Sequence, residues 1–358
     1  MNDKVKILVV DDSITYRQIM VAVIEQIIDA ECIGTAASGQ IALRKIASMQ
    51  PDLVLLDVVM PEMDGVETLQ QLKRDYPAVE AIMISSFNMT NAKQTLRSLQ
   101  IGALDFIAKP NSSNSEQSIN ELVRYLQPFI HLIQTKKYAS LSRQRQNISP
   151  TAVLPPPLPT AKIKRGKFDL CVIGISTGGP EALDQLIPQL DASLPCPIII
   201  VQHMPPLFTA SLAQKLNEET RLEVSEVKGG EKIAPGHIYI AQGGIHVVLR
   251  EALDSGFYLA LTDTPPVNNC RPSVDVLFRS VAAVFKGNVL AIVMTGMGRD
   301  GTDGVKMLKR QGAKCIIQDE ASSVVWGMPG SVYEAGLADE VIPLKQLSAR
   351  IAALVLRD

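Results

Sequence analysis

The chain has 358 residues, of which 46% are hydrophobic and 20% are charged. This length favours two domains, and this composition excludes a generally disordered protein. The formal net charge of −2 argues against a dedicated nucleic-acid-binding protein, and no apolar run reaches the ~18–20 residues of a membrane span.

The amino-terminal segment and the cysteines indicate the compartment. Paired aspartates directly follow the first apolar run, Val5–Val10, and this pattern is not that of a secretory signal. The five cysteines are widely scattered and form no C-x-x-C pair, so their spacing fits neither a disulfide framework nor a zinc site. We therefore expect a cytoplasmic protein with reduced cysteines and no membrane insertion.

Apolar runs alternate with segments of helical periodicity through residues 1–135, which we assign to a first domain. The strand-like runs are Val5–Val10, Glu31–Gly34, Leu53–Leu56, Ala81–Ile84 and Asp105–Ala108. The candidate helices lie near residues 14–28, 39–49, 65–75, 91–101 and 115–135. This alternation predicts a parallel sheet that helices cover on both faces.

Polar side chains stand where these predicted strands end. Asp11 and Asp12 follow the first strand, Asp57 the third, Ser85 the fourth and Lys109 the fifth. Ligands of open parallel sheets bind beyond the carboxyl ends of the strands, so these groups are expected to meet. The carboxylates would repel one another without a cation, and their oxygens suit Mg²⁺. A carboxylate held beside Mg²⁺ can attack phosphorus and form an acyl phosphate.

The segments DDS, LLDVVMPEMDG, ISS and AKP resemble the response-regulator receiver domain over about residues 4–130. The resemblance implies a five-stranded flavodoxin-like fold with Asp57 as the phosphoacceptor. It also implies that Ser85 is the switch hydroxyl and that Lys109 contacts the phosphoryl group. The Mg²⁺ ligands that it implies are Asp11, Asp12, Asp57 and the carbonyl oxygen of Val59.

Residues 136–167 differ in composition from the chain on either side. Residues 136–168 contain eight basic residues, no acidic residue and five prolines. Proline fixes φ and lacks the amide donor, so the segment favours an extended, solvated chain. We predict a linker, with a loop inside one domain as the weaker alternative because long structureless loops are uncommon there.

The second half, residues 168–358, continues the α/β pattern. Its strand-like runs are Leu170–Ile173, Pro197–Val201, His237–Ile240, His246–Leu249, Leu290–Met294 and Lys314–Ile317. Its candidate helices lie near residues 180–190, 207–218, 273–285 and 303–311. The region from Tyr239 to Leu261 contains Gly-Gly and Asp-Ser-Gly turns and predicts antiparallel pairing. We expect a second α/β domain with a mainly parallel sheet.

A G-x-S-x-G motif, residues 174–178, lies directly after the first strand of this half and before a predicted helix. The glycines permit a tight turn that exposes Ser176 at a helix amino terminus, where backbone amides could stabilise an oxyanion. The motif alone does not decide the function, because Gly-Ser turns after strands also bind phosphate groups.

A serine nucleophile needs a general base. His203 follows the apolar run Pro197–Val201, which places it at the same edge of the predicted sheet as Ser176. His246, after a Gly-Gly turn, is the alternative. The position at a parallel strand end favours His203.

The base needs an orienting acid, and two aspartates are candidates. Asp300 follows the strand Leu290–Met294 in a loop, so it can converge with Ser176 and His203. Asp303 is the alternative, although it is expected at the start of the next helix, where acids commonly stabilise the first turn. The order Ser, His, Asp differs from that of the α/β-hydrolases, so a different fold is expected.

The loop that holds Asp300 permits another interpretation. Residues 296–301 fit G-x-G-x-x-G, and Asp319 follows a further strand about 20 residues on, as in a dinucleotide fingerprint. Asp300 would then place a carboxylate beside a pyrophosphate, and the motif lies late in its domain. Both points disfavour dinucleotide binding.

Six blocks of the second half resemble the chemotaxis protein-glutamate methylesterase domain across nearly all of residues 168–355. The blocks are GISTGGPEAL, VQHMPPLFTASLA, PGHIYIAQGGIHVVL, PPVNNCRPSVDVLFRSVA, MTGMGRDGTDGVKMLKRQGA and EASSVVWGMPGSV. The resemblance implies Ser176 as nucleophile, His203 as base and Asp300 as orienting acid. It implies that the backbone amides of Thr177 and Met297 stabilise the oxyanion.

The same resemblance implies the reaction and the partners. It implies hydrolysis of γ-glutamyl methyl esters, and deamidation of particular glutamines, on methyl-accepting chemotaxis receptors. The implied phosphodonor is a chemotaxis histidine kinase, and ester hydrolysis needs no cofactor. The chain departs from the family at Gln242, where proline is frequent, and carries Cys270 at a variable position. Neither residue is expected to touch Ser176, His203 or Asp300, although both could affect substrate contacts, and no chemical step is assigned to His246.

The two halves together suggest regulation by phosphorylation. Phosphorylating Asp57 is expected to raise esterase activity, since the unphosphorylated receiver is expected to obstruct access to Ser176. The competing hypothesis is a non-catalytic regulator in which the second domain only binds partners. The presence of Ser176, His203 and Asp300 together argues against it, because a binding module needs none of the three.

Overall fold

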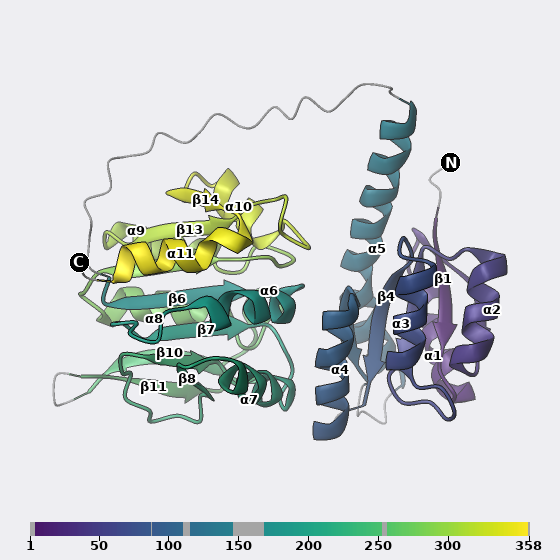
Figure 1. Ribbon diagram of the computed structural model, residues 1–358, viewed down its shortest axis with the longest axis horizontal. Coiled ribbons are helices and arrows are strands. Elements are labelled where there is room, and N and C mark those ends of the chain that lie inside the picture. Colours follow the sequence, from purple (N-terminus) through teal and green to yellow (C-terminus); the bar gives the residue numbers. More distant parts are fainter. Residues whose placement is uncertain (1–3, 87, 110–114, 146–167, 253–255, 357–358) are drawn as a thin grey trace. The chain divides into compact units, whose positions relative to one another are not determined.

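The computed structural model describes residues 4–86, 88–109, 115–145, 168–252 and 256–356. The chain divides into two compact units, residues 1–153 and 154–358. Each unit is built around its own sheet, with helices on both faces of that sheet (Figure 1). The α/β class predicted for both halves is confirmed.

The first unit contains a five-stranded sheet in the order β2-β1-β3-β4-β5, with every neighbouring pair parallel. Its strands are β1 (Val5–Val10), β2 (Ala30–Ala36), β3 (Leu53–Asp57), β4 (Glu80–Ser85) and β5 (Asp105–Ala108). Its helices are α1 (Ile14–Glu25), α2 (Gly39–Met49), α3 (Gly65–Asp75), α4 (Met89–Ile101) and α5 (Ser115–Arg145). This strand order is that of flavodoxin-like folds, so the predicted receiver fold is confirmed.

Helix starts in this unit follow local capping chemistry. The Ser13 hydroxyl accepts a hydrogen bond from the Tyr16 amide at the start of α1, directly after the paired aspartates. Asp64 and Glu67 form a reciprocal capping box at the start of α3. Each cap satisfies amides that have no partner inside the helix, so it fixes where the chain leaves the sheet edge.

Helix α5 continues through residues 136–145, which the sequence analysis assigned to an extended linker. The prediction is wrong there because these residues include no proline or glycine. Two lysines also tie the helix to the sheet: Lys136 Nζ lies 3.0 Å from Glu80 Oε1, and Lys137 Nζ lies 3.0 Å from Asp52 Oδ2. The rest of the predicted linker, residues 146–167, lies outside the described residues.

The second unit contains a seven-stranded parallel sheet in the order β14-β13-β12-β6-β7-β9-β8 and a separate antiparallel pair, β10-β11. The strands are β6 (Leu170–Ile175), β7 (Ile198–Gln202), β8 (Glu223–Glu226), β9 (His237–Ile240), β10 (His246–Glu251), β11 (Phe257–Thr262), β12 (Val289–Val293), β13 (Lys314–Gln318) and β14 (Glu340–Ile342). The antiparallel pairing predicted near residues 239–261 is confirmed for β10 and β11, whereas β9 joins the parallel sheet.

Helices cover both faces of this sheet (Figure 1). They are α6 (Gly179–Leu186), α7 (Phe208–Glu219), α8 (Val274–Val284), α9 (Thr302–Arg310), α10 (Met328–Glu334) and α11 (Leu344–Val355). Helix α6 packs with α7 and α11, while α9 packs with α8 and α10. The strands between them are almost wholly buried, which explains their continuous apolar runs.

Four elements of this unit were not predicted from the sequence, and three of them are short. Strands β8 and β14 have four and three residues, and they form only as edge strands paired to β9 and β13. Helix α10 has seven residues and begins with a proline in its first turn. Helix α11 does show a helical apolar period, at Leu344, Leu347, Ile351 and Leu354, all of them buried.

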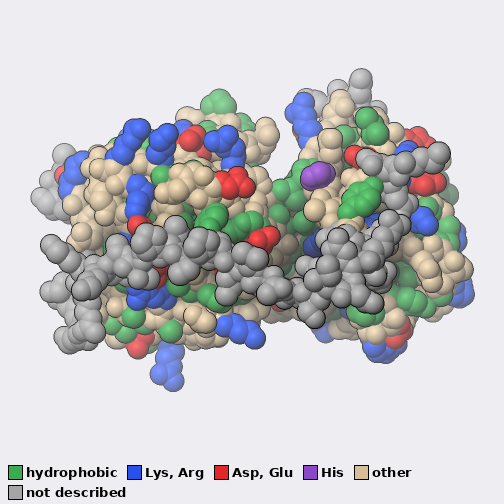
Figure 2. All heavy atoms as spheres, turned by 90° about the horizontal axis from the view of Figure 1, so that it is seen from above, with side chains coloured by type: hydrophobic (Ala, Val, Ile, Leu, Met, Phe, Trp, Pro, Cys, Tyr) green, Lys and Arg blue, Asp and Glu red, His purple; other side chains and the backbone are tan. Residues whose placement is uncertain are grey.

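The surface carries mixed charge. Acidic and basic side chains are interspersed on the face drawn in Figure 2, in keeping with a formal net charge of −2. In the described part of the chain, no helix combines the length and the apolar character that a bilayer span requires.

Candidate functional site

Three adjacent strands bring the proposed nucleophile, base and acid to one edge of the second sheet. Ser176 follows β6, His203 follows β7, and Asp300 lies in the loop after β12. These strands are neighbours in the order β12-β6-β7 and run parallel, so their carboxyl ends meet at the same edge. The His203 amide donates to the Ile175 carbonyl at 3.1 Å, which sets the base beside the serine turn.

The serine turn depends on glycines at close contacts. Gly178 has a φ of 76°, a left-handed conformation that glycine adopts without steric cost. A Cβ at Gly296 would lie 2.8 Å from the Ser176 Cβ, so only glycine lets this second loop pass so close to the serine. The buried Gln202 side chain donates a hydrogen bond to the Ser176 carbonyl at 2.9 Å and so stabilises the turn.

His203 Nε2 lies 2.8 Å from Asp300 Oδ2, and Asp300 is only 2% exposed. Asp300 also accepts hydrogen bonds from the Ser273 hydroxyl at 2.8 Å and from the Val274 amide at 2.7 Å. The Val274 amide belongs to the first turn of α8, where the helix dipole favours a negative charge. Asp300 is thus a fully bonded carboxylate aimed at the imidazole.

These contacts shift the pKa values of the pair in opposite directions. Burial by itself lowers the pKa of His203, but the hydrogen bond to Asp300 and the Cys270 thiol outweigh burial and raise it. Burial raises the pKa of Asp300, but the hydrogen bonds from His203, Asn268 and Ser273 prevail and lower it to about 2. Asp300 therefore stays ionised at neutral pH and favours a proton on Nε2.

The other imidazole nitrogen faces a cysteine. His203 Nδ1 lies 3.5 Å from Cys270 Sγ, so the expectation that Cys270 does not touch the proposed triad is wrong. Within the described ranges, no hydrogen bond joins the Ser176 hydroxyl to either imidazole nitrogen. Hydrogen bonds between a catalytic serine and its base are often long before substrate binds, so the arrangement does not exclude that pairing.

The structure separates the candidates that the sequence left open. His246 is fully buried, accepts from the Ser273 amide through Nδ1 and lies 3.1 Å from the Pro265 carbonyl through Nε2. Both of its nitrogens are therefore occupied by backbone groups. Asp303 is exposed and lies 3.5 Å from Arg279, so it makes a surface ion pair on α9. Only Asp300 contacts His203 among the two aspartates.

Two backbone amides near Ser176 are candidates for oxyanion stabilisation. The Thr177 residue follows the serine at the start of the turn, and Met297 lies in the loop whose Gly296 touches Ser176. Neither amide donates a hydrogen bond among the residues that the structure describes. Two free amides beside a serine hydroxyl are the donors that a tetrahedral intermediate requires.

Sequence reasoning missed the residues that support Asp300. Asn268 Nδ2 donates to Asp300 Oδ1 and to Asp275 Oδ2, both at 2.9 Å. Asp275 Oδ1 in turn accepts from the amides of Gly301 and Gly304, which fixes the loop after Asp300. Asn268 and Asp275 lie in the PPVNNCRPSVD segment, and Asp300 lies in the GRDG segment. Their spacing along the sequence does not reveal which groups they bind.

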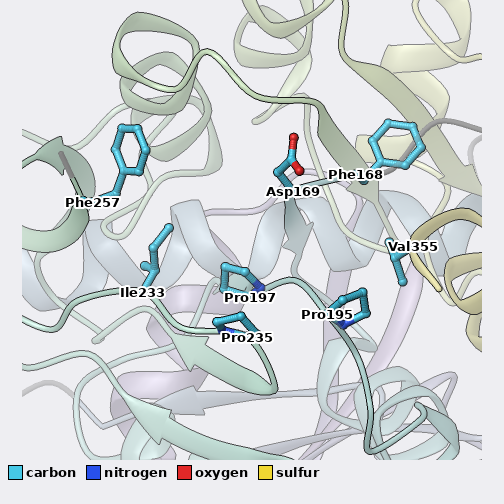
Figure 3. A pocket seen from close by; sticks show the side chains of 9 residues that line it. Phe168, Asp169, Pro195, Pro197, Ile233, Pro235, Phe257 and Val355 are labelled. Atoms are coloured by element: carbon cyan, nitrogen blue, oxygen red, sulfur yellow. The ribbon is translucent and has the colours of Figure 1, made fainter. Parts of the chain in front are cut away.

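A pocket lies at the opposite end of the same strands (Figure 3). It is lined by Phe168, Asp169, Pro195, Pro197, Ile233, Pro235, Gly256, Phe257 and Val355. Several of these residues precede β6, β7 and β9, so the pocket opens at the amino ends of the strands. Asp169 there accepts from the Asn288 amide at 2.9 Å, a structural role. Parallel sheets bind substrates at the carboxyl ends, so we do not assign this pocket to the reaction.

The first unit gathers the predicted acidic residues at its own carboxyl edge. One oxygen from each of Asp11, Asp12 and Asp57 lies within 4.8 Å of the others. Lys109 Nζ lies 2.8 Å from Asp11 Oδ2 and 2.9 Å from Asp57 Oδ2. A single ammonium therefore faces two buried carboxylates, and a hard cation with oxygen ligands fits this donor set.

Burial raises the pKa of Asp57 to about 6, against the opposing effect of Lys109. Ser85 is fully buried at the end of β4, and its hydroxyl accepts from the Thr95 hydroxyl at 2.9 Å. Lys109 lies over the ring of Tyr16 at 4.3 Å from its centroid, a cation–π contact that the sequence analysis missed. Val59, two residues after Asp57, is half exposed.

Comparisons with known proteins match both units. Residues 171–351 match the family described as CheB methylesterase, and residues 7–120 match the response regulator receiver domain. A protein-glutamate methylesterase/protein-glutamine glutaminase of Trichodesmium erythraeum is 42% identical over 97% of this chain and 98% of its own. That of Desulfotalea psychrophila is 43% identical over 98% of each chain. The crystal structure of the Thermotoga maritima CheB methylesterase catalytic domain is 42% identical, with a TM-score of 0.51 over 53% of this chain and 100% of that one.

Proposed function

This chain belongs to the CheB methylesterase family, and we propose that it is a phosphorylation-activated serine hydrolase of bacterial chemotaxis. Its substrates are γ-glutamyl methyl esters on methyl-accepting chemotaxis receptors, and it deamidates specific receptor glutamines. The observation that carries the proposal is the 2.8 Å contact between His203 and Asp300 at the strand end next to Ser176. The reaction takes place in the cytoplasm.

The chemistry follows from the proton positions at the site. Nε2 of His203 donates to Asp300, so the lone pair of Nδ1 is the base that takes the proton of Ser176 Oγ. The serine oxygen attacks the ester carbonyl, and the amides of Thr177 and Met297 hold the oxyanion. His203 then protonates methanol as it leaves, and water hydrolyses the glutamyl-enzyme. A glutamine substrate releases ammonia by the same route. The chain's own groups suffice for these steps.

The receiver is proposed to accept a phosphoryl group at Asp57 from a chemotaxis histidine kinase. Asp11, Asp12, Asp57 and the Val59 carbonyl would hold Mg²⁺. When bound, Mg²⁺ neutralises charge on the phosphoryl oxygens. Lys109 is proposed to contact the phosphoryl group, and its 2.9 Å contact with Asp57 supports this role. Ser85, now bonded to Thr95, is the hydroxyl that can change partner when the new anion appears.

We further propose that residues 1–145 act as the regulatory domain and residues 168–358 as the catalytic domain. Phosphorylation can regulate the esterase only by shifting a balance between two states that differ in activity. The proposed end of the receiver is residue 145, and the continuation of α5 to Arg145 supports it.

Methanol release from methylated receptor membranes tests the proposal. The full chain should release methanol, and Mg²⁺ with a small-molecule phosphodonor should increase the rate. The Ser176→Ala variant should release none above background in either condition. A non-catalytic regulator would release no methanol in any condition, and a constitutive esterase would ignore the phosphodonor.

A further inference from the structure

Cys270 and His203 lie together at the catalytic edge although 67 positions separate them in the chain. Cys270 Sγ is 3.5 Å from His203 Nδ1, and one atom each of His203, Cys270 and Asp300 lie within 4.8 Å of one another. Neither the family resemblance nor the proposed reaction gives the thiol a role. We propose that Cys270 and His203 form an inhibitory binding site for a thiophilic divalent metal ion, with Zn²⁺ as the best fit.

The separation of the two donor atoms suits this ion. Zn²⁺ binds cysteine sulfur at about 2.3 Å and histidine nitrogen at about 2.0–2.1 Å, usually with tetrahedral geometry. A tetrahedral angle between two such bonds places nitrogen and sulfur about 3.5 Å apart. The observed distance from Nδ1 to Sγ is 3.5 Å, which matches this separation.

Asp300 supplies the outer support that histidine ligands usually have. Histidines that bind metal through one nitrogen typically donate the other N–H to a carboxylate, which fixes the ring and its tautomer. Asp300 Oδ2 occupies this position at 2.8 Å from Nε2. Its oxygens also accept from Ser273 and Val274, so Asp300 orients the ring and does not bind the ion itself. Water fills the remaining coordination positions.

The turn that carries Cys270 is rigid. Val267 and Cys270 exchange two backbone hydrogen bonds, of 3.1 and 2.9 Å. The two residues between them, Asn268 and Asn269, have φ values of 53° and 61°, as in a tight two-residue turn. The Asn268 side chain fixes this turn to Asp300 at 2.9 Å. The thiol is partly exposed, so an ion can reach it from solvent.

Binding displaces the proton of the thiol and, where the imidazole is protonated, that of Nδ1, and it removes the base. The Cys270 thiol loses its proton to solvent as the sulfur–metal bond forms, and the Nδ1 lone pair forms the second bond. That lone pair can then no longer accept the proton of Ser176. The loss of esterase activity rests on the proposed function, whereas metal binding itself does not. Mg²⁺, which prefers oxygen ligands, should not compete at this thiol and imidazole.

Co²⁺ absorption and Zn²⁺ inhibition test the site separately in the full chain. Co²⁺ should give a thiolate-to-metal absorption band, and Zn²⁺ should remove it. Cys270→Ala should lose the band, and relative to its own metal-free rate it should need about tenfold more Zn²⁺ or more for half inhibition. Cys32→Ala is the matched control, since Cys32 is also partly exposed but lies in the other unit. It should behave as wild type in both assays.

The two assays separate failure of the metal site from failure of the esterase. A wild-type chain without the Co²⁺ band, or a band that persists in Cys270→Ala, would overturn the metal site whatever the esterase result. Equal Zn²⁺ inhibition of wild type and Cys270→Ala would overturn the inhibitory role. A clear band in a chain without esterase activity would instead overturn the proposed function and leave the metal site standing.

Discussion

Two buried aspartates, one in each unit, occupy comparable positions and have opposite properties. Asp57 ends β3 and Asp300 follows β12, each at the carboxyl edge of a parallel sheet, and both are at most 3% exposed. Burial acts to raise the pKa of both carboxyls. At Asp57 the effect of burial is the larger one, and the pKa is about 6. At Asp300 hydrogen bonds prevail and the pKa is about 2.

The difference lies in the donors that surround each carboxylate. Asp57 faces one ammonium, which it shares with Asp11. Asp300 is bonded by an imidazole, an amide side chain, a hydroxyl and the first amides of α8. The carboxyl edge of a parallel sheet thus supports two different roles for an aspartate. A carboxylate with few donors is available to bind a cation or attack phosphorus, while one with many donors can only orient its partner.

The largest effect is expected at the nucleophile. Ser176→Ala should reduce methanol release by about 10⁴-fold or more, because the residues of a triad act as a unit. Phosphorylation of Asp57 should be unchanged, since it depends on the other carboxylate site. Ser193→Ala, in an exposed turn where the hydroxyl donates to Asp191, is the control and should keep full activity. Full activity in Ser176→Ala would end the serine hydrolase proposal.

Asp300→Asn tests whether this carboxylate orients the base. An amide can leave Nε2 without an acceptor and allow the wrong tautomer, so activity should fall by up to about 10⁴-fold, as for serine proteases. Asp303→Asn is the matched control three residues away, where the exposed side chain pairs with Arg279. The comparison is read from kcat in the methanol assay. Similar losses in both variants would contradict an orienting role specific to Asp300.

Asp57→Asn tests the other carboxylate. The variant should keep the basal esterase rate and lose the whole increase caused by Mg²⁺ and a phosphodonor, because the amide cannot form an acyl phosphate. Asp75→Asn, an exposed carboxylate paired with Arg74, should respond as wild type does. A residual response in Asp57→Asn would mean that phosphate acts elsewhere.

The isolated residues 160–358 should be more active than the unphosphorylated full chain if the receiver inhibits.

The smallest expected effect is on stability, and its sign should differ between the two sites. In metal-free buffer at neutral pH, Asp57→Asn should stabilise the first unit by about 1–3 kcal/mol, because it removes a buried charge that is poorly compensated. Asp300→Asn should destabilise the second unit by a similar amount, because its donors lose a charged acceptor. Thermal unfolding of the two units measures both values.

The pH dependence of this effect follows from the raised pKa of Asp57. The folded chain binds this proton more tightly than the unfolded chain does, so wild-type stability should fall as the pH rises from about 4 to about 6. Asp57→Asn lacks the titrating group and should show no such fall in the first unit. An identical pH dependence in both proteins would show that the carboxyl is not perturbed.

The sequence by itself determined the two parallel sheets and the polar residues at their carboxyl edges. Strands buried on both faces appear in the sequence as continuous apolar runs. The residue after such a run therefore lies at the carboxyl edge of the sheet. Asp57, Ser176 and His203 could therefore be placed from local pattern alone. The capping pattern before α3 and the glycines around Ser176 are equally local, since they act on neighbouring residues.

Only the tertiary structure decided which side chains meet across the edges. The sequence favoured Asp300 and left Asp303 as the alternative; in the structure Asp300 lies against the first turn of α8 and reaches His203. Cys270 reaches His203 because a turn between β11 and α8 returns to the strand end, which no spacing reveals. Helix α5 extends beyond its predicted end, where Lys136 pairs with Glu80 and Lys137 pairs with Asp52. Each outcome depends on contacts between distant segments, so local pattern could not determine it.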